Sequence, residues 1–267
     1  MKRIVVVAFL TVGCLIGFFC FFPFRVKISR DYPPPPIGWY PEPETKADFL
    51  FRAIIVGDEP QVHQLLEEGI SPDSESEMSF RSPLMLAAEY GRERIATLLM
   101  EKGADINARD FRGSSALMCA IWRGHTNIAS VLINKGAALN NSDSGGYTPL
   151  IVALSGRHSS TVEALVKHGA DVNQKYRENF TPLQIAVGGQ QTEMVNFLIG
   201  KGARVDDQDN DGYTALMFAA ENGYVALVRL LLDNGASTLI TNKANKTALS
   251  LAREKKHSEC VNLLSAK

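Results

Sequence analysis

The sequence predicts an all-α fold, a solenoid of repeated helix-turn-helix units, preceded by one N-terminal transmembrane helix. Two observations lead to this prediction. A tripeptide of Ser or Thr, then Pro or Ala, then Leu recurs every 33 residues, and residues 4–24 contain no charged side chain. A fixed period of that length is typical of stacked repeats. An uncharged apolar run of that length is typical of a helix that spans a bilayer.

Composition describes an ordinary globular chain of 267 residues, with 45% hydrophobic residues and a formal net charge of -1. Binding to nucleic acid depends on a basic surface that neutralises phosphates, and this composition does not favour one. The four cysteines divide between Cys14 and Cys20 near the N-terminus and Cys119 and Cys260 far apart in the rest of the chain. This spacing favours neither a disulfide framework nor a zinc site. We therefore expect no nucleic acid, no metal and no cofactor.

Residues 1–30 are predicted to be an N-terminal membrane anchor or signal segment. A helix over residues 4–24 would be about 30 Å long at roughly 1.5 Å per residue, which matches the thickness of a bilayer core. Lys2 and Arg3 precede the apolar run and Arg25 follows it. No small-x-small cleavage site lies before Arg25. An uncleaved single-pass anchor is therefore the preferred interpretation.

A bacterial lipoprotein signal is the alternative. Val12-Gly13-Cys14 resembles the end of a lipobox, in which Cys14 would be acylated and become the mature N-terminus. Thr11 stands where that signal prefers Leu, and ten apolar residues would remain behind the lipidated cysteine. Basic residues flank the run on both sides, so their number barely indicates which end of the helix faces the cytoplasm. The very short segment before the run is easily left in the cytoplasm, which favours export of the rest of the chain. We expect a single-pass inner (cell) membrane protein whose repeats lie in the periplasm, or else a lipoprotein anchored through Cys14.

Residues 31–45 are predicted to be a proline-rich linker. Six of the 12 prolines lie here, at positions 33, 34, 35, 36, 41 and 43. Proline lacks a backbone N–H and favours polyproline II, so this segment should be a stiff spacer of up to roughly 45 Å. A proline-rich ligand for an SH3-like domain is the less favoured alternative.

The repeats occupy residues 75–267. The recurring tripeptides are Ser82-Pro-Leu84, Ser115-Ala-Leu117, Thr148-Pro-Leu150, Thr181-Pro-Leu183, Thr214-Ala-Leu216 and Thr247-Ala-Leu249. A glycine followed by alanine keeps the same period, at Gly103, Gly136, Gly169, Gly202 and Gly235. These motifs resemble the ankyrin repeat, whose signature is Thr-Pro-Leu-His with a period of 33 residues. The resemblance implies an ankyrin-repeat domain over residues 46–267, with a divergent capping unit at 46–74 and six repeats at 75–267. It also implies that β-hairpin-like loops connect the helix-turn-helix units.

Each recurring residue has a physical role in such a unit. Ser or Thr caps the first amides of a helix, Pro is tolerated in the first turn, and Leu begins a buried stripe. Alanine, at position 87 and at the equivalent position of the other five repeats, lets neighbouring helix pairs approach closely. One unit cannot bury its stripe alone, so the core forms only when units stack.

The sequence departs from the family at two positions of the repeat. The signature histidine is replaced, by Met85, Met118, Ile151, Gln184, Met217 and Ser250, so its hydrogen-bond network should be different or missing. The glycine between the two helices of a unit becomes Arg157, Gln190 and Lys256 in three repeats. Those three turns should be less ideal than the others.

No enzyme activity is expected. The five histidines, at positions 63, 125, 158, 168 and 257, lie in different repeats without a neighbouring acid in a metal or triad arrangement. The Gly188-Gly189 pair lacks the Lys-Ser/Thr that follows a phosphate-binding loop. Cys119 and Cys260 are expected to be buried structural thiols. We therefore expect no catalytic residues and no small-molecule substrate.

The sequence favours a protein-binding module, because a rigid concave surface without catalytic groups is suited to gripping a protein partner. The resemblance implies that the turns before the Ser/Thr caps, the hairpin tips and the ends of the inner helices line this surface. Aromatic residues and arginine dominate interface hot spots. The candidate partner-binding residues are Tyr90, Phe111, Arg112, Trp122, Arg123, Tyr147, Phe180 and Tyr213, of which Tyr147, Phe180 and Tyr213 are expected to form a ladder of rings.

Small exported ankyrin proteins of bacteria are similar to this chain. That family includes immunity proteins that neutralise secreted antibacterial effectors, and partners of periplasmic enzymes such as catalase. The resemblance thus implies an immunity protein. An accessory factor for a catalase-like periplasmic enzyme and a cytoplasm-facing membrane scaffold are the alternatives.

The anchor interpretation predicts that a reporter active only outside the cytoplasm, fused after Lys267, is active in a bacterial host. The chain should also stay in the membrane fraction at high salt, because burial of an apolar helix does not depend on charge. An inactive reporter or a soluble chain would contradict this interpretation. Cys14→Ser separates the two kinds of anchor, since it abolishes lipid incorporation only if Cys14 is acylated.

Overall fold

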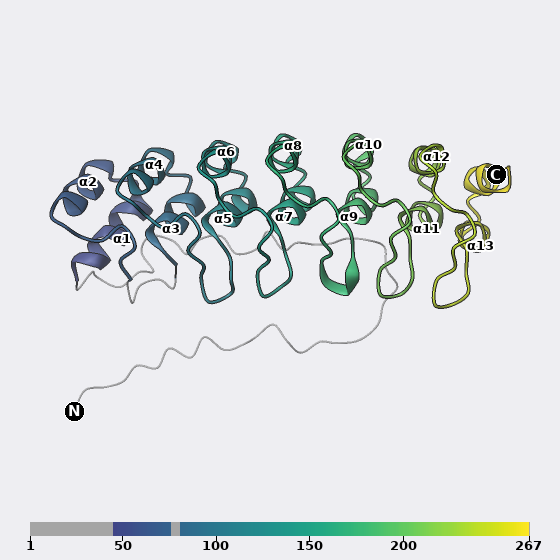
Figure 1. The fold of residues 1–267 in the computed structure, drawn as a ribbon, viewed down its shortest axis with the longest axis horizontal. Helices are drawn as coiled ribbons and strands as arrows, with labels where there is room; N and C mark the ends of the chain where they lie inside the picture. Colours follow the sequence, from purple (N-terminus) through teal and green to yellow (C-terminus); the bar gives the residue numbers. More distant parts are fainter. Residues whose placement is uncertain (1–44, 76–80, 267) are drawn as a thin grey trace, which may run out of the picture.

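The computed structural model describes residues 45–75 and 81–266 of the chain. The predicted membrane anchor, its alternative lipidation site Cys14 and the linker up to residue 44 lie outside the described residues. The described residues form fourteen α-helices in seven consecutive pairs (Figure 1). None of these helices is both long enough and apolar enough to cross a membrane.

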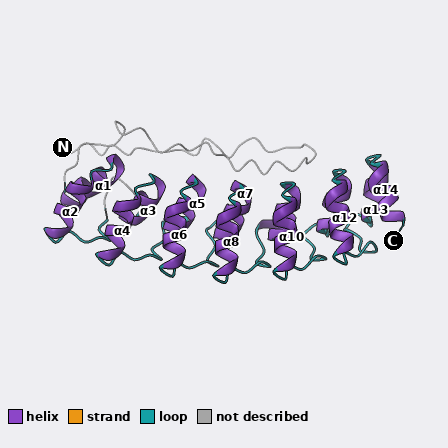
Figure 2. Ribbon diagram, turned by 90° about the horizontal axis from the view of Figure 1, so that it is seen from above, coloured by secondary structure: helices purple, strands orange, loops and turns teal. Residues whose placement is uncertain are grey.

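The helix pairs form two layers. The inner layer contains α1 (Lys46–Val56), α3 (Pro83–Glu89), α5 (Ala116–Arg123), α7 (Pro149–Gly156), α9 (Pro182–Gly188), α11 (Ala215–Glu221) and α13 (Ala248–Glu254). The outer layer contains α2 (Glu59–Glu67), α4 (Glu93–Glu101), α6 (Thr126–Asn134), α8 (Ser159–Lys167), α10 (Thr192–Gly200), α12 (Val225–Asp233) and α14 (Ser258–Ser265). Figure 1 shows the layers as two rows with the connecting loops beneath the inner row, and Figure 2 shows the pairs side by side. The prediction of an all-α solenoid is confirmed.

Hydroxyl caps start the inner helices, as the sequence predicts. The side-chain oxygen of each recurring Ser or Thr accepts a hydrogen bond from the amide three residues later. Thr45 caps α1 in the same way, and its own amide donates to the carboxylate of Asp48 over 3.0 Å. A cap of this kind satisfies an amide that has no partner within the helix. Each of the six recurring caps therefore fixes the start of its inner helix at one position of the 33-residue period.

Small and branched side chains form the contacts between inner helices. The recurring alanines Ala87, Ala120, Ala153, Ala186, Ala219 and Ala252 are completely buried. The recurring leucines Leu84, Leu117, Leu150, Leu183 and Leu216 are at most 1% exposed. Leu249 is only half-buried. Its predicted place in the buried stripe is wrong, because the side chain packs only partly against the core, and among the described inner helices α11 is the one that contacts α13 extensively.

Hairpin-like loops connect successive units, although the described residues contain no extended strand and only an isolated antiparallel bridge between Arg109 and Ser115. A carboxylate closes the loop before α7, where Asp143 Oδ1 accepts hydrogen bonds from the amides of Gly145 (2.8 Å) and Tyr147 (2.9 Å). Asp110, Asp209 and Asn242 close three other loops in the same way.

Backbone hydrogen bonds join neighbouring loops to one another. The amide of Ser144 donates to the carbonyl oxygen of Arg112 over 2.7 Å, and the amide of Lys243 donates to that of Asp211 over 2.9 Å. The same contact joins Asn210 to Glu178, over 2.7 Å. The loops therefore stack with the period of the helices and hold the residues at their tips in fixed positions.

The turn between the two helices of each unit contains a residue in the left-handed backbone region. Glycine occupies this position in four units, for example Gly124 with φ 78°. Arg157 (φ 59°), Gln190 (φ 53°) and Lys256 (φ 62°) occupy it in the other three. The left-handed conformation costs a residue with a Cβ about 1–2 kcal/mol. The prediction that these three turns are less ideal is confirmed.

Gln190→Gly should raise the free energy of unfolding by about 0.5 kcal/mol, because relief of the left-handed strain exceeds the greater chain entropy that glycine loses on folding. Gln190 is exposed, so the substitution removes little packing. Gly124→Ala is the matched opposite change and should lower stability by about 1 kcal/mol. Urea denaturation measures both variants, and a destabilised Gln190→Gly variant would contradict the strain argument.

Candidate partner-binding surface

The candidate surface includes residues of the hairpin-like loops and of the last turns of the inner helices. Five large hydrophobic side chains are exposed among the described residues, namely Phe49 (43%), Val56 (41%), Phe111 (73%), Trp122 (38%) and Leu239 (84%). Phe111 and Trp122 belong to one repeat, where they occupy the hairpin tip and the last turn of α5. Both are among the residues that the sequence proposes for partner binding.

A buried carboxylate organises the charges beside Trp122. The side chain of Glu89, at the end of α3, is only 5% exposed and contacts two guanidinium groups. Arg123 donates to Glu89 Oε1 over 2.6 Å, and Arg81 donates to Glu89 Oε2. Arg81 also lies 3.9 Å from Asp110. Glu89 therefore joins two repeats and fixes Arg123 next to Trp122.

The hairpin tip presents an arginine and an aromatic ring together. The guanidinium carbon of Arg112 lies 5.3 Å from the centre of the Phe111 ring, within the range of a cation–π contact. Asp110 Oδ1 accepts hydrogen bonds from the amides of Arg112 (2.9 Å) and Ser114 (2.8 Å). The tip is thus a closed turn that holds Phe111 and Arg112 outward, and both side chains are exposed.

Trp122 is the first ring of an aromatic cluster that crosses three repeats. It meets Tyr147 edge-on, with ring centres 5.8 Å apart and planes at 87°. Tyr147 in turn meets Tyr176 at 4.5 Å. Arg177 lies 5.9 Å above the Tyr147 ring and donates from Nε to the carbonyl oxygen of Gly145 over 2.7 Å. Aromatic pairs of this geometry stabilise their arrangement by about 0.5–1.5 kcal/mol beyond the area they bury.

A second group of rings lies further along the solenoid. Phe218, in α11, lies 5.8 Å from Phe180 and 5.0 Å from Tyr213. Phe218 is 6% exposed, whereas Phe180, Tyr213 and also Tyr90 are half-buried. The ladder expected from the sequence contained Tyr147, Phe180 and Tyr213. In the structure, the rings closest to these three residues are Tyr176 and Phe218, which were not part of the expected ladder.

Tyr176 is a residue of the candidate surface that sequence reasoning missed. It stands where neighbouring repeats carry the loop-closing residues Asp110, Asp143, Asp209 and Asn242. The loop that follows differs too, because Glu178 (φ 53°) and Asn179 (φ 61°) form a left-handed turn within η2 (Arg177–Asn179). An aromatic residue at an otherwise polar position of the repeat was the signal available in the sequence.

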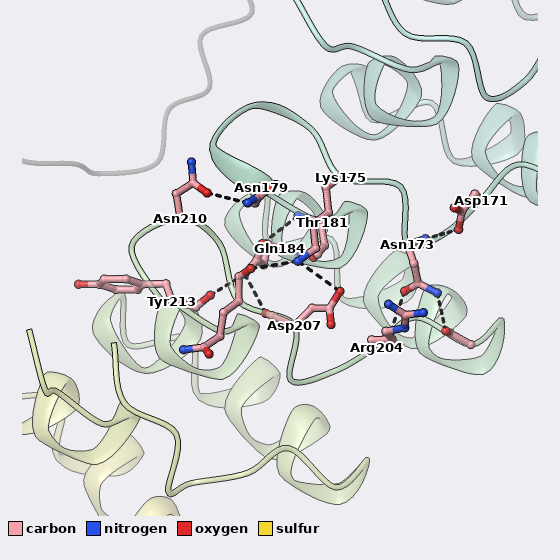
Figure 3. A network of polar contacts seen from close by, with 12 residues as sticks. Asp171, Asn173, Lys175, Asn179, Thr181, Gln184, Arg204, Asp207, Asn210 and Tyr213 are labelled. Atoms are coloured by element: carbon pink, nitrogen blue, oxygen red, sulfur yellow. Dashed lines mark hydrogen bonds and ion pairs between the residues drawn. The ribbon is translucent and has the colours of Figure 1, made fainter. Parts of the chain in front are cut away.

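Gln184 stands at the position of the missing signature histidine in one repeat, and its side chain makes hydrogen bonds to the next unit. Its side chain is completely buried, accepts a hydrogen bond from the Thr181 amide over 2.8 Å, and donates to the carbonyl oxygen of Tyr213 over 2.7 Å (Figure 3). Beside it, Asn173 Oδ1 accepts from the amide of Arg204 over 2.9 Å. The hydrogen-bond network is therefore different from that of the signature histidine, and it joins the start of α9 to the loop before α11.

Two histidines make structural hydrogen bonds between neighbouring units. His125 Nε2 donates to the carbonyl oxygen of Glu89 over 3.1 Å, and His257 makes the same bond to Glu221 over 3.0 Å. Burial, followed by the charges of Arg123 and Arg92, lowers the pKa of His125, so the neutral ring is favoured. Burial raises the pKa of the half-buried Cys119 thiol to about 11, which keeps it protonated near neutral pH. Within the described residues, no group of three or more His, Cys, Asp or Glu side chains could hold a metal ion.

The whole described array matches a known family of repeats. The family model for ankyrin repeats (3 copies) matches residues 50–143, 109–176, 138–209 and 183–267. Among solved structures, the ankyrin repeat domain of Bcl-3, described as a unique member of the IkappaB protein family, is 29% identical with a TM-score of 0.73. That similarity covers 81% of this chain and 97% of the Bcl-3 chain. No curated protein sequence is significantly similar to this chain.

Glu89→Ala should lower the free energy of unfolding by about 2 kcal/mol, because it leaves Arg81 and Arg123 without their shared carboxylate. Both arginines keep some contact with water, so the loss should be smaller than for a fully buried pair. Glu101→Ala, at the exposed end of α4, removes the same charge and should change stability by less than about 0.5 kcal/mol. Equal effects in urea denaturation would show that Glu89 does not organise this part of the surface.

Proposed function

The chain belongs to the ankyrin-repeat family, and from this premise we propose that it is a membrane-tethered module that binds one protein partner through its aromatic–arginine surface. We define this surface as Phe111, Arg112, Trp122, Arg123, Tyr147, Tyr176 and Arg177. Ankyrin repeats form a protein-interaction scaffold, so the chain is a protein-binding module. The choice of surface, the tether and the side of the membrane are parts of the proposal.

The exposure of Trp122 is the observation that carries the choice of surface. A tryptophan that is 38% exposed yet packed edge-on against Tyr147 has a fixed orientation, so little side-chain entropy is lost when a partner covers it. Arg123, the next residue of α5, and Arg112, at the hairpin tip of the same repeat, supply charged donors for a partner's carboxylates. Tryptophan, tyrosine and arginine are the residue types most enriched among interface hot spots.

Trp122→Ala should weaken binding to the partner by at least about 1 kcal/mol, the usual scale of a hot spot, while the unfolding free energy changes by a similar or smaller amount. The partner is first identified by purification of the full chain from detergent-extracted membranes, and affinity is then measured by isothermal titration calorimetry. Leu239→Ala is the matched control, because Leu239 is 84% exposed in the loop of the last repeat. It should leave affinity unchanged.

Weaker binding by Leu239→Ala with unchanged binding by Trp122→Ala would move the partner site away from the aromatic–arginine surface. A loss of stability without a loss of affinity in Trp122→Ala would assign the ring to packing alone.

For the cellular role we propose an immunity protein that neutralises a secreted antibacterial effector on the extracytoplasmic side of the membrane. Resemblance to small exported bacterial ankyrin proteins supports this role, and the apolar run at residues 4–24 supports the location. A partner of a catalase-like periplasmic enzyme and a cytoplasm-facing scaffold are the alternatives. A folded surface that binds one protein tightly and carries no chemistry is what neutralisation of a toxin requires.

Deletion of this chain should make cells sensitive to killing by siblings that secrete the effector, and expression of the full chain should restore growth in competition assays. Trp122→Ala should restore protection poorly if the effector occupies the proposed surface, because its affinity is reduced. Cells that lack the chain and compete as well as the parent strain would contradict the immunity role. Catalase activity in periplasmic extracts of the same cells tests the catalase-partner alternative, which predicts that this activity falls when the chain is absent.

A further inference from the structure

Two arginines reach the loop before α7 from the loops on either side of it. Arg109, in the preceding loop, donates to the carbonyl oxygen of Ser142, and Arg177, in the following loop, donates from Nε to that of Gly145 over 2.7 Å. Both arginines are exposed. A backbone carbonyl group is neutral, so these bonds fix the two guanidinium groups without cancelling their charge. Two positive charges are therefore held in place, and one of them lies 5.9 Å above the Tyr147 ring.

Arg112 and Lys175 add two further exposed positive charges to these loops. The guanidinium group of Arg112 lies over the Phe111 ring and makes neither a hydrogen bond nor an ion pair within the described residues. Lys175 donates to the carbonyl oxygen of Gln208 over 3.2 Å and lies 3.7 Å from a carboxylate oxygen of Asp207. Of the four exposed cations, Lys175 alone is within ion-pair distance of a carboxylate in the described part of the chain.

The carboxylates of the same loops and helix ends are mostly turned inward. The side chains of Glu89 and Asp110 are only 5% and 3% exposed. Asp143 is half-buried, and its Oδ1 accepts hydrogen bonds from the amides of its own loop. Glu178 is the exposed acid of the three loops. The face that these loops present to a partner is therefore positive, although the whole chain has a formal net charge of -1.

The loop before α11 has the opposite charge and marks one end of this positive stretch. Four aspartates lie between residues 206 and 211, and Asp211 is exposed. The amide of Asn210 donates to the carbonyl oxygen of Glu178 over 2.7 Å, so the acidic loop adjoins the positive ones directly. Stacked units lie roughly 10 Å apart, so the positive stretch covers about 20 Å from the loop before α5 to the loop before α9. An extended chain spans this length with about six residues.

We propose that the partner lays an extended acidic segment of about six residues across the loops before α5, α7 and α9. Its carboxylates accept charge-assisted hydrogen bonds from Arg112 and Arg177. The aspartates of the loop before α11 repel any continuation of the acidic stretch, which fixes where the segment ends and excludes partners with a longer one. This inference rests on the proposed function, since it names the chemistry of the partner that the same surface binds.

A protein segment fits these charges better than other polyanions do. A nucleic acid carries a negative charge at every nucleotide, and the aspartates beside the positive stretch would repel its continuing backbone. A flat lipid surface would reach the loop tips, but the side chain of Arg123 belongs to the end of α5 and is only 20% exposed. A narrow peptide segment is able to contact both levels of the surface.

Fluorescence anisotropy of a fluorescein-labelled decaglutamate peptide tests the proposal with the full chain in uncharged detergent micelles at low salt. Arg112→Ala together with Arg177→Ala should weaken peptide binding at least about fivefold, because two exposed charge pairs are lost. Lys135→Ala together with Arg229→Ala is the matched control. It removes two exposed positive charges at the outer layer and should change the affinity by less than about twofold.

Glu178→Gln should strengthen decaglutamate binding about twofold, because it removes the exposed acid from the positive stretch. Glu193→Gln makes the same change on the exposed side of α10 and should leave the affinity unchanged. A variant whose loops were merely loosened would not bind the peptide more tightly, so this gain separates charge from folding defects.

Binding of decaglutamate should be lost in 1 M salt, where the screening length falls to about 3 Å. An unchanged peptide affinity in the double-arginine variant would overturn the proposal. Tighter binding of a thymidine oligonucleotide of equal length, or of phosphatidylglycerol vesicles, that depends on the same two arginines would also overturn it, because the occupant would then be a nucleic acid or a lipid surface.

These measurements fail independently of the proposed function. They involve no native partner, so they remain informative if Trp122→Ala leaves partner affinity unchanged. Conversely, Trp122→Ala weakens partner binding at the proposed surface even if decaglutamate does not bind there.

Discussion

Stacking of each inner helix on the next, through an alanine without solvent exposure, is the interaction on which the rest of the structure depends. The alanines at positions 87, 120, 153, 186, 219 and 252 are completely buried, and only a side chain this small allows helices to approach so closely. The recurring leucines, three residues before each of these alanines, complete the core. A single helix pair could not bury these side chains, so each unit is stabilised by its neighbours.

This dependence on neighbours explains how a surface of loops becomes rigid enough to bind. The helices repeat at a constant interval, so the loops stack as well, and backbone bonds such as Ser144 to Arg112 lock them together. Trp122, Tyr147 and Tyr176 then meet although they come from three different repeats. Binding energy is not lost in ordering such a surface, because folding has already ordered it.

Much of the fold could be predicted from the sequence because the same local rule acts six times. Each Ser or Thr cap satisfies an amide within three residues, and each recurring leucine faces the next unit, so periodicity alone locates them. Leu249 departs from this rule because its burial depends on contacts between units, which the period does not reveal. The left-handed turns at Arg157, Gln190 and Lys256 were signalled by the loss of glycine.

The candidate surface was less predictable because its contacts join different repeats. Phe111, Arg112, Trp122 and Arg123 were proposed from residue type and position, and their exposure and pairing were found only in the structure. Tyr176 was missed because it belongs to no shared motif, since the other repeats have Asp or Asn at its position. Glu89 was missed because nothing local indicates that one carboxylate is shared by Arg81 and Arg123, which lie 8 and 34 residues away.

Leu183→Asp tests most directly whether stacking of inner helices holds the solenoid together. Leu183 is completely buried in α9, in the middle of the array. An unpaired carboxylate there should lower the free energy of unfolding by about 3 kcal/mol or more, measured by urea denaturation followed by circular dichroism. An unchanged denaturation midpoint would contradict the stacking of α9 against its neighbours and the register of the repeats.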